Sequence, residues 1–222
     1  MKISGFIFDF DGTLTTLKVD FSRMRKEVVS CLEAYSIPQE VARDKYILEM
    51  VEAGFEYLCD VKRENAEAFR RQAFEIIEKL EVSAAQIAKP IEGVVQMLKS
   101  LRTRGMRTAV VTRNCLQAVT IAFPSLSLLV DAVLARDQVK QTKPHLNHLA
   151  KALKAIGTEA KEAVMVGDHP MDIMMGKEGG LMAVGVLTGS GRREDFLAAG
   201  ADYVLASAAD LLDLLDRMTR RI

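Results

Sequence analysis

Two carboxylates, Asp9 and Asp11, stand one residue apart directly after the apolar run of residues 3–8 and before Gly12. Charges at the end of a buried strand are costly unless a cation or a reaction uses them. A carboxylate in this place can attack phosphorus and form an aspartyl-phosphate. A second carboxyl group two residues on can protonate the leaving oxygen. The pattern therefore favours a chemical role over a pair of solvated turn residues.

Two further groups that could bind phosphate follow later in the chain. Thr112, Arg113 and Asn114 come after the run 108–111, where a hydroxyl and backbone N–H groups can hold phosphate oxygens. Taken alone, this group is more typical of a helix cap. Lys143 precedes Pro144, and we expect the proline in the first turn of a helix. The lysine could balance charge on a nucleophile and a transferring phosphoryl group, although a surface lysine is the commoner explanation.

Asp168 and Asp172 form the fourth group, after the run 163–166 and Gly167. Mg²⁺ takes oxygen ligands in octahedral geometry and keeps several waters. Asp168 can therefore bind a metal from the end of a strand. Asp172 lies one helical turn further and could orient Lys143 or bind the metal through water.

The four groups follow four of six short apolar runs, and helical patterns lie between these runs. Runs of this kind predict strands buried on both faces. Their alternation with helices predicts an α/β fold, a doubly wound, Rossmann-like parallel sheet with helices on both faces. The carboxyl ends of such strands share one edge, where ligands bind. The runs are residues 3–8, 108–111, 130–134, 163–166, 182–187 and 203–205.

Residues 16–88 contain no strand-like run. Apolar residues recur at helical spacing between Phe69 and Leu80, which is typical of an amphipathic helix. We therefore expect a helical-bundle cap domain at 16–88, inserted into an α/β core domain of residues 1–15 and 89–222.

Local signals suggest helix boundaries inside this insertion. Ser36 followed by Gln39 predicts a capping box, in which the two residues satisfy the first backbone N–H groups of a helix. Pro38 is then expected in the first turn of that helix. Gly54 predicts the break before the next helix.

Composition excludes several classes of function. The 222 residues include 30 basic and 30 acidic ones, so no electrostatic footprint for nucleic acid or an anionic membrane is present. Three widely separated cysteines indicate reduced thiols and a cytoplasmic protein. No apolar run approaches the length of a membrane span, and the N-terminus is not typical of a signal peptide.

Together, the four groups resemble the signature motifs of the haloacid dehalogenase-like hydrolases, in order and at compatible spacing. The resemblance covers essentially the whole chain, with the insertion at the position of that family's first-type cap. Residues 183–204 look most like the phosphoglycolate phosphatase branch. The resemblance implies a Mg²⁺-dependent phosphatase that acts through an aspartyl-phosphate. Its partner would be a small phosphorylated metabolite, a phosphoglycolate-like compound or a sugar phosphate.

The resemblance also implies roles for individual residues. Asp9 would be the nucleophile and Asp11 the general acid and base. Thr112 and Lys143 would bind the phosphate, and Asp9 and Asp168 would hold Mg²⁺ with the main-chain carbonyl of Asp11. Further candidates for phosphate contacts are Gly12, Arg113 and Asn114, with Asp172 in a supporting role.

Other functions remain open at this stage. A phosphomutase would return the phosphoryl group to a sugar, and a non-catalytic regulatory protein would only bind Mg²⁺. A dehalogenase is disfavoured because a halide needs no protonation by Asp11. A phosphonate hydrolase would need a Schiff-base lysine, for which Lys18 and Lys26 are candidates. Thr16 and Leu17 replace the Asp-Ser usual in the phosphoglycolate phosphatase branch, so the substrate is open, as is the choice between monomer and homodimer.

The three histidines give weaker signals. His145 and His148 have a spacing that suits a metal, but no further ligand pattern completes a zinc site. We interpret both as solvated helix residues or neighbours of the phosphate. His169 lies in the fourth group and is a candidate for substrate contact.

Overall fold

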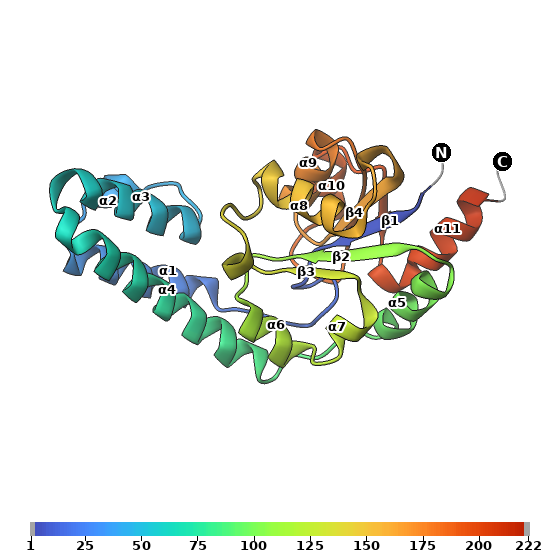
Figure 1. Ribbon diagram of the computed structural model, residues 1–222, viewed down its shortest axis with the longest axis horizontal. Coiled ribbons are helices and arrows are strands. Elements are labelled where there is room, and N and C mark those ends of the chain that lie inside the picture. Colours follow the sequence, from blue (N-terminus) through green and yellow to red (C-terminus); the bar gives the residue numbers. More distant parts are fainter. Residues whose placement is uncertain (1–2, 220–222) are drawn as a thin grey trace. The chain divides into compact units, whose positions relative to one another are not determined.

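The computed structural model describes residues 3–219 of the chain. They form two compact units. One comprises the described residues up to Lys18 and those from Ala85 onward, and the other is Val19–Ala84. The first unit contains a sheet flanked by helices, and the second consists of helices (Figure 1).

The sheet explains why distant parts of the sequence meet. Among the described residues, six parallel strands are hydrogen-bonded in the order β3-β2-β1-β4-β5-β6. The chain runs outward from β1 to β3 and returns to β4 on the other side of β1, which creates the switch point where doubly wound sheets bind ligands. The predicted α/β fold is confirmed. The strands are β1 (Gly5–Phe8), β2 (Arg107–Val111), β3 (Ala132–Leu134), β4 (Ala163–Gly167), β5 (Met182–Val186) and β6 (Tyr203–Leu205).

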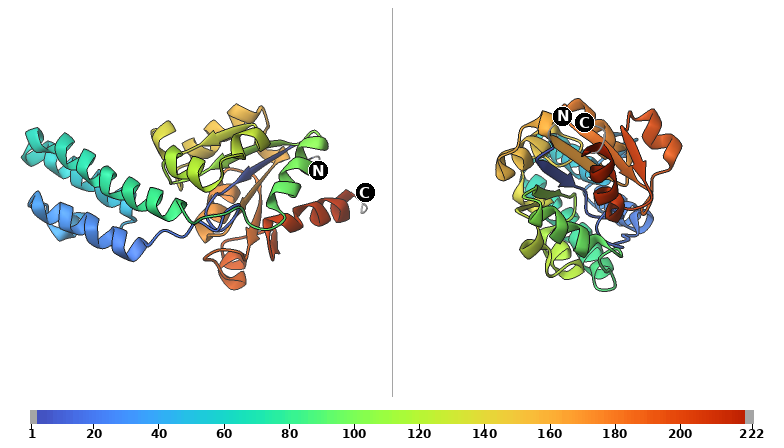
Figure 2. Two further views of the ribbon diagram at one scale, coloured as in Figure 1. Left: turned by 90° about the horizontal axis from the view of Figure 1, so that it is seen from below. Right: turned by 90° about the vertical axis from the view of Figure 1, so that its right-hand side faces the viewer.

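Helices cover both faces of this sheet (Figures 1 and 2). One face carries α5 (Val94–Thr103), α6 (Leu116–Ala122), α7 (Leu126–Leu129) and α11 (Leu211–Thr219). The other carries α8 (Leu146–Ile156), α9 (Pro170–Glu178) and α10 (Arg193–Ala198). Short 3₁₀ turns lie at η1 (Arg136–Gln138), η2 (Ala160–Glu162) and η3 (Ala208–Asp210).

The core between the sheet and α8 fixes the height of the strand ends. Ile7 of β1, Ala109 of β2 and Met165 of β4 are fully buried there. They pack with Leu149 of α8 and Met175 of α9 in one cluster. Because close-packed interiors resist displacement, the residues that follow these strands start from fixed positions.

The helical unit contains α1 (Phe21–Ala34), α2 (Gln39–Ala42), α3 (Ile47–Val61) and α4 (Arg63–Ala85). The predicted apolar stripe lies on α4, where Phe69, Ala73 and Ile77 are fully buried. Helices α1 and α4 lie side by side (Figure 2), and the Tyr35 hydroxyl that follows α1 donates to Gln72 of α4 at 3.1 Å. The fold predicted for the insertion, a helical bundle, is confirmed.

Gly54 does not end a helix as predicted. It lies within α3, and a Cβ there would approach the side chains of Leu32 on α1 and Phe69 on α4 to 2.8 Å. The glycine therefore serves close packing of three helices, which a one-dimensional pattern does not distinguish from a break.

Two predicted helix starts are also wrong. Ser36 has a left-handed φ of 56°, and the N-cap of α2 is Pro38 without a side-chain hydrogen bond, so no capping box forms. Pro144 precedes the N-cap of α8, His145, and so lies outside the helix. In both places the start of the helix is displaced by one or two residues from the prediction.

Two global expectations concern membranes and cysteines. None of the helices in the described range is long and apolar enough to cross a membrane. Cys31, Cys59 and Cys115 are free cysteines within that range, and Cys31 and Cys115 are buried.

Candidate active site

Asp9 follows the last residue of β1 at the switch point of the sheet. Its backbone N–H donates to the carbonyl of Val166 on β4 at 2.8 Å, which ties the two strand ends together. Its carboxylate is 6% exposed. One oxygen accepts from the ammonium of Lys143, and the other accepts from the hydroxyl of Thr13 at 3.3 Å. Both oxygens are therefore held, although the residue stands at a turn.

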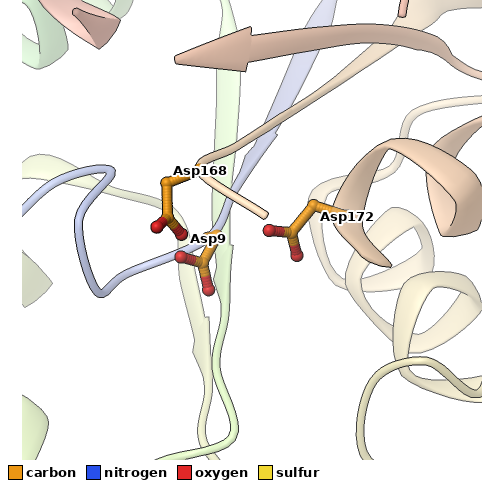
Figure 3. Close-up of side chains that lie close together, drawn as sticks. All are labelled: Asp9, Asp168 and Asp172. Atoms are coloured by element: carbon orange, nitrogen blue, oxygen red, sulfur yellow. The ribbon is translucent and has the colours of Figure 1, made fainter. Parts of the chain in front are cut away.

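Three carboxylates converge at this point. Asp168 follows β4, Asp172 lies in the first turn of α9, and both point toward Asp9 (Figure 3). Each contributes an oxygen to a group in which all the oxygens lie within 4.8 Å of one another. Asp168 is 8% exposed and Asp172 only 2%. The structure thus places three acidic groups together with little water around them.

Burial and mutual repulsion disfavour the charged forms of these acids. Burial, and then the charge of Asp9, raise the pKa of Asp168 to about 7 against hydrogen bonds from Ser190 that lower it. Burial raises the pKa of Asp172 to about 6; the charge of Lys143 opposes this rise and that of Asp9 adds to it. The site as it stands has an excess of negative charge that a cation would offset.

Lys143 supplies part of the compensating positive charge. Its ammonium pairs with Asp9 and with Asp172, the latter at 2.8 Å, and the residue is 4% exposed. Burial alone would lower the pKa of Lys143, but the charges of Asp172 and Asp9 outweigh it, so the pKa lies above its ordinary value. The ammonium therefore stays charged throughout the neutral range.

The main chain of Lys143 is held by His148 and Arg113. The Lys143 N–H donates to Nδ1 of His148 at 3.1 Å, and Nε2 of His148 lies 2.9 Å from the carbonyl of Leu134. Since a carbonyl only accepts, we assign the proton of the ring to Nε2. The Arg113 guanidinium donates to the Lys143 carbonyl. Both backbone polar groups of the lysine are thus bonded.

His148 corrects an expectation from the sequence. It is fully buried in α8, so it is not a solvated helix residue. Burial, and to a lesser extent the charges of Lys143, Lys151 and Arg113, lower the pKa of His148 to about 4 against its bond to the Leu134 carbonyl. A neutral ring fits both of its hydrogen bonds.

The segment after β2 is tied to the segment after β3. Thr112 donates its N–H to the Leu134 carbonyl at 3.2 Å, the same carbonyl that His148 reaches, and its hydroxyl accepts from the Asn114 N–H at 3.1 Å. The Arg136 guanidinium donates to the Arg113 carbonyl at 2.9 Å. The Arg136 N–H donates to the Asn114 carbonyl at 2.9 Å.

Asn114 has a second role in the geometry. Its side-chain amide lies 2.7 Å from each carboxylate oxygen of Asp11. Asn114 is 4% exposed, and Asp11 is half-buried. The structure therefore brings the segment after β2 onto the second carboxylate of the opening pair.

The loop after β5 contains contacts that the sequence did not reveal. Ser190 donates its N–H at 2.7 Å and its hydroxyl at 3.0 Å to one oxygen of Asp168, and Thr188 donates to the carbonyl of Gly12. A Cβ at Gly189 would lie 1.9 Å from the same Asp168 oxygen, so a side chain cannot fit there. The only available signal was a polar, glycine-rich stretch after a strand that ends at this edge.

The remaining histidines are helix caps. Nδ1 of His145 accepts from the N–H of Asn147 at 3.2 Å at the start of α8. Nδ1 of His169 accepts from the N–H of Met171 at 3.1 Å at the start of α9. Burial lowers the pKa of His169.

The residues predicted for the site thus divide into three sets. Asp9, Asp168, Asp172 and Lys143 meet side chain to side chain. Asp11 and Asn114 form a separate contact. Thr112 and Arg113 connect to the lysine through backbone groups of the segments after β2 and β3, and Gly12 makes the turn that follows Asp9 with a φ of 67°.

The chain belongs to the haloacid dehalogenase-like hydrolases, because the model of that family matches residues 6–186. The prediction of an enzyme of this family is confirmed.

Two curated relatives match over nearly their whole length. Pyrophosphatase PpaX of Halalkalibacterium halodurans is 29% identical over 97% of this chain and 98% of its own. N-acetylmuramic acid 6-phosphate phosphatase of Pseudomonas aeruginosa is 26% identical over 98% of this chain and 96% of its own.

Solved structures share the fold. A hydrolase from Pseudomonas syringae has a TM-score of 0.68 at 24% identity and covers 96% of this chain and 98% of its own. A protein described as a phosphoglycolate phosphatase of Haemophilus somnus has a TM-score of 0.65 at 20% identity, with coverages of 97% and 99%. At these identities the likeness shows the fold alone.

Proposed function

We propose that this hydrolase cleaves a small phosphate monoester through an aspartyl-phosphate on Asp9. The observation that carries the proposal is the fixed carboxylate of Asp9, with Lys143 on one oxygen and Thr13 on the other. A nucleophile in this position needs no further orientation, and the adjacent ammonium offsets the charge that would repel a phosphate. Both curated relatives described above are named for reactions of phosphate compounds.

The reaction has two displacement steps. In the first, an oxygen of Asp9 forms a bond to phosphorus, and the bond from phosphorus to the leaving oxygen breaks. The leaving oxygen keeps the electron pair and takes the proton of the Asp11 carboxyl group. In the second, the oxygen of a water molecule attacks phosphorus, and Asp11 takes a proton from that water. The bond to Asp9 breaks, which releases inorganic phosphate and restores both carboxyl groups.

The donor set fits Mg²⁺. Two buried carboxylates, Asp9 and Asp168, offer the oxygen ligands that this ion prefers, and we assign the main-chain carbonyl of Asp11 as a third. Burial, and then the charge of Asp9, raise the pKa of Asp168, and a divalent cation would offset the repulsion between the two carboxylates. When bound, the ion would neutralise charge on the phosphoryl oxygens. Asp172 holds the ammonium of Lys143 in place by accepting a hydrogen bond from it at 2.8 Å.

We assign the phosphate contacts to the ammonium of Lys143, the Thr112 hydroxyl, Arg113 and the turn at Gly12. Gly12 follows β1, Thr112 and Arg113 follow β2, and Lys143 lies in the segment between β3 and α8. All of them therefore lie at the carboxyl edge that binds ligands in this fold. Their backbones are held by internal bonds, which lowers the entropic cost of ordering a binding site.

We further propose that the helical unit acts as a cap that selects the substrate. It begins at Val19, shortly after Thr16 and Leu17, where the sequence departs from the phosphoglycolate phosphatase pattern. Lys18 and Lys26, the candidates for the Schiff-base lysine of a phosphonate hydrolase, are both exposed. The reduced cysteines fit a cytoplasmic location.

The proposal is tested with wild type and Asp9→Asn on 4-nitrophenyl phosphate with Mg²⁺. The variant keeps the shape of the side chain but is a poor nucleophile, so turnover should disappear. Asp195, which lies on α10 and pairs with Arg192 at 3.0 Å, supplies the matched control Asp195→Asn with unchanged turnover. Undiminished turnover of Asp9→Asn would refute the mechanism.

A panel of compounds then identifies the substrate. It should contain 2-phosphoglycolate, hexose phosphates, nucleoside monophosphates, N-acetylmuramic acid 6-phosphate and inorganic diphosphate. Diphosphate is the second candidate, because the relative at 29% identity is named a pyrophosphatase. Release of inorganic phosphate, without formation of a phosphate isomer from hexose phosphates, separates a phosphatase from a phosphomutase.

A further inference from the structure

We infer that Asn114 is a positioning residue for Asp11, and that through this contact it sets how well the enzyme expels poor leaving groups. The inference rests on the proposed function, in which Asp11 protonates the leaving oxygen. It assigns Asn114 to the acid rather than to the phosphate.

The geometry carries the inference. The side-chain nitrogen of Asn114 lies 2.7 Å from both oxygens of Asp11, and a carboxyl group can accept from both amide hydrogens. The backbone of Asn114 is fixed on both sides. Its N–H donates to the Thr112 hydroxyl at 3.1 Å, and its carbonyl accepts from the N–H of Arg136 at 2.9 Å. The amide is therefore a rigid donor aimed at one target.

The chemistry of an amide donor explains why this contact would matter. The NH₂ group of Asn114 can only donate. When Asp11 carries a proton, the amide bonds to the unprotonated oxygen, and the O–H is left on the other oxygen for the leaving group. Without Asn114, the Asp11 carboxyl group would lose a donor that fixes its orientation, and the proton would point in the right direction less often.

A phosphate ligand would behave differently. An amide that bound the phosphate would interact with every substrate equally, since all share the phosphoryl group. An amide that positions the acid affects the first displacement step only as far as the leaving oxygen needs a proton, whereas the second step is the same for every ester. 4-Nitrophenolate leaves easily without one, and phenolate needs it more. Phenyl phosphate and 4-nitrophenyl phosphate therefore separate the two roles while they keep nearly the same shape.

The experiment compares wild type, Asn114→Ala and the isosteric Asn114→Asp on these two esters. Both variants should lose about tenfold more kcat/KM on phenyl phosphate than on 4-nitrophenyl phosphate, because kcat/KM reports the first displacement step, in which the leaving group departs. In the background of Asp11→Asn, the further change Asn114→Ala should have no selective effect, because the acid is already absent. Circular dichroism and turnover of 4-nitrophenyl phosphate confirm folding.

Equal losses of kcat/KM on both esters would overturn the inference and make Asn114 a phosphate ligand. If wild type turns over no phosphate ester, the proposed function fails instead.

The contact between Asn114 and Asp11 is then tested without catalysis. The sequence has three asparagines, Asn65, Asn114 and Asn147, so selectively labelled protein gives few side-chain amide signals. In NMR spectra, Asp11→Ala should shift the pair of side-chain NH₂ signals of Asn114. It should leave the pair of Asn147 unchanged, since Asn147 bonds to Gln141 at 2.7 Å. An unshifted Asn114 pair would contradict the contact itself.

Discussion

The two halves of the carboxyl edge of the sheet accommodate buried polar groups in different ways. At the ends of β1 and β4, the carboxylates Asp9, Asp168 and Asp172 meet one another and the ammonium of Lys143, which comes from the segment after β3 and is counted here with the β1–β4 half. After β2 and β3, side chains bond mainly to the main chain, as Arg113 does to the Lys143 carbonyl and Arg136 to the Arg113 carbonyl. We propose that the first half carries the reactive charges and that the second holds backbones in place.

This difference predicts how the two halves respond to substitution. Loss of a charge in the β1–β4 half leaves another buried charge without compensation, which affects both chemistry and folding. Loss of a side chain in the β2–β3 half frees a backbone group, which changes positions more than charges. Effects on turnover should therefore decrease from the first half to the second.

Lys143→Met should give the largest effect in this comparison. It removes the cation between Asp9 and Asp172 while it keeps much of the side-chain volume. We expect turnover to fall by about 10³-fold and the free energy of unfolding by about 3 kcal/mol. Steady-state kinetics and urea unfolding measure the two. Lys177→Met is the matched control, since Lys177 is more exposed and its ion pair with Asp202, at 2.9 Å, lies outside the site. A loss of turnover of only a few-fold in Lys143→Met would remove the distinction between the halves.

Asp172→Asn should have a smaller effect. The amide keeps the shape of a side chain that fits against Gly167 and can still accept from Lys143. The substitution removes one of the two negative charges that pair with the lysine ammonium. A change of this kind beside a metal or a catalytic group costs about 10-fold to 100-fold in activity. Steady-state kinetics of Asp172→Asn, compared with wild type and with the control variant Asp202→Asn, measure this loss of turnover. A loss as large as that of Lys143→Met would mean that Asp172 takes part in the chemistry directly.

Mg²⁺ should stabilise the wild-type protein, because a ligand that binds only the folded state raises the free energy of unfolding by mass action. The effect depends on the carboxylates of the β1–β4 half. Thermal unfolding with increasing Mg²⁺ should shift the wild-type midpoint upward and shift that of Asp168→Asn much less. Asp195→Asn, on the exposed start of α10, should respond like wild type. An equal shift in Asp168→Asn would place the ion elsewhere.

The sequence predicted the β1–β4 half better than the β2–β3 half, for a physical reason. Acidic residues directly after buried strands are conspicuous, because burial of charge requires an explanation. The end points of parallel strands also follow from topology alone. Asp9, Asp168 and Lys143 could therefore be assigned to one edge before their contacts were known.

The β2–β3 half depends on contacts across long sequence separations, which no local pattern encodes. His148 was interpreted as a solvated helix residue or a neighbour of the phosphate, because no further ligand pattern completed a metal site, whereas its ring is buried between Lys143 and Leu134. Asn114 was expected at the phosphate and contacts Asp11. Ser190 was not singled out, since nothing before the fold shows that its loop returns to Asp168.

Substitution of His148 should have the smallest effect on turnover and a measurable effect on stability with pH. His148→Gln can keep the donor to the Leu134 carbonyl but loses the acceptor for the Lys143 N–H, whereas His148→Asn favours the second bond over the first. We expect each to cost about 1–2 kcal/mol at pH 7, as for one lost buried hydrogen bond, and only a few-fold in turnover, since the charges of the β1–β4 half are untouched.

The sign of the pH dependence follows from the pKa of His148, which is about 4 in the folded protein against 6.5 as the ordinary value. Between these values the unfolded chain binds more protons, so this group makes the wild type less stable as the pH falls. The advantage of wild type over His148→Gln should therefore shrink below pH 6.5, by at most about 1.4 kcal/mol per pH unit. Asp168 and Asp172 have raised pKa values and act in the opposite direction, but both proteins contain them, so the difference isolates the histidine. His145→Gln removes an exposed histidine from the start of the same helix and is the matched control. A wild-type advantage that stays constant down to pH 4 would show that the ring between the two halves is not held neutral.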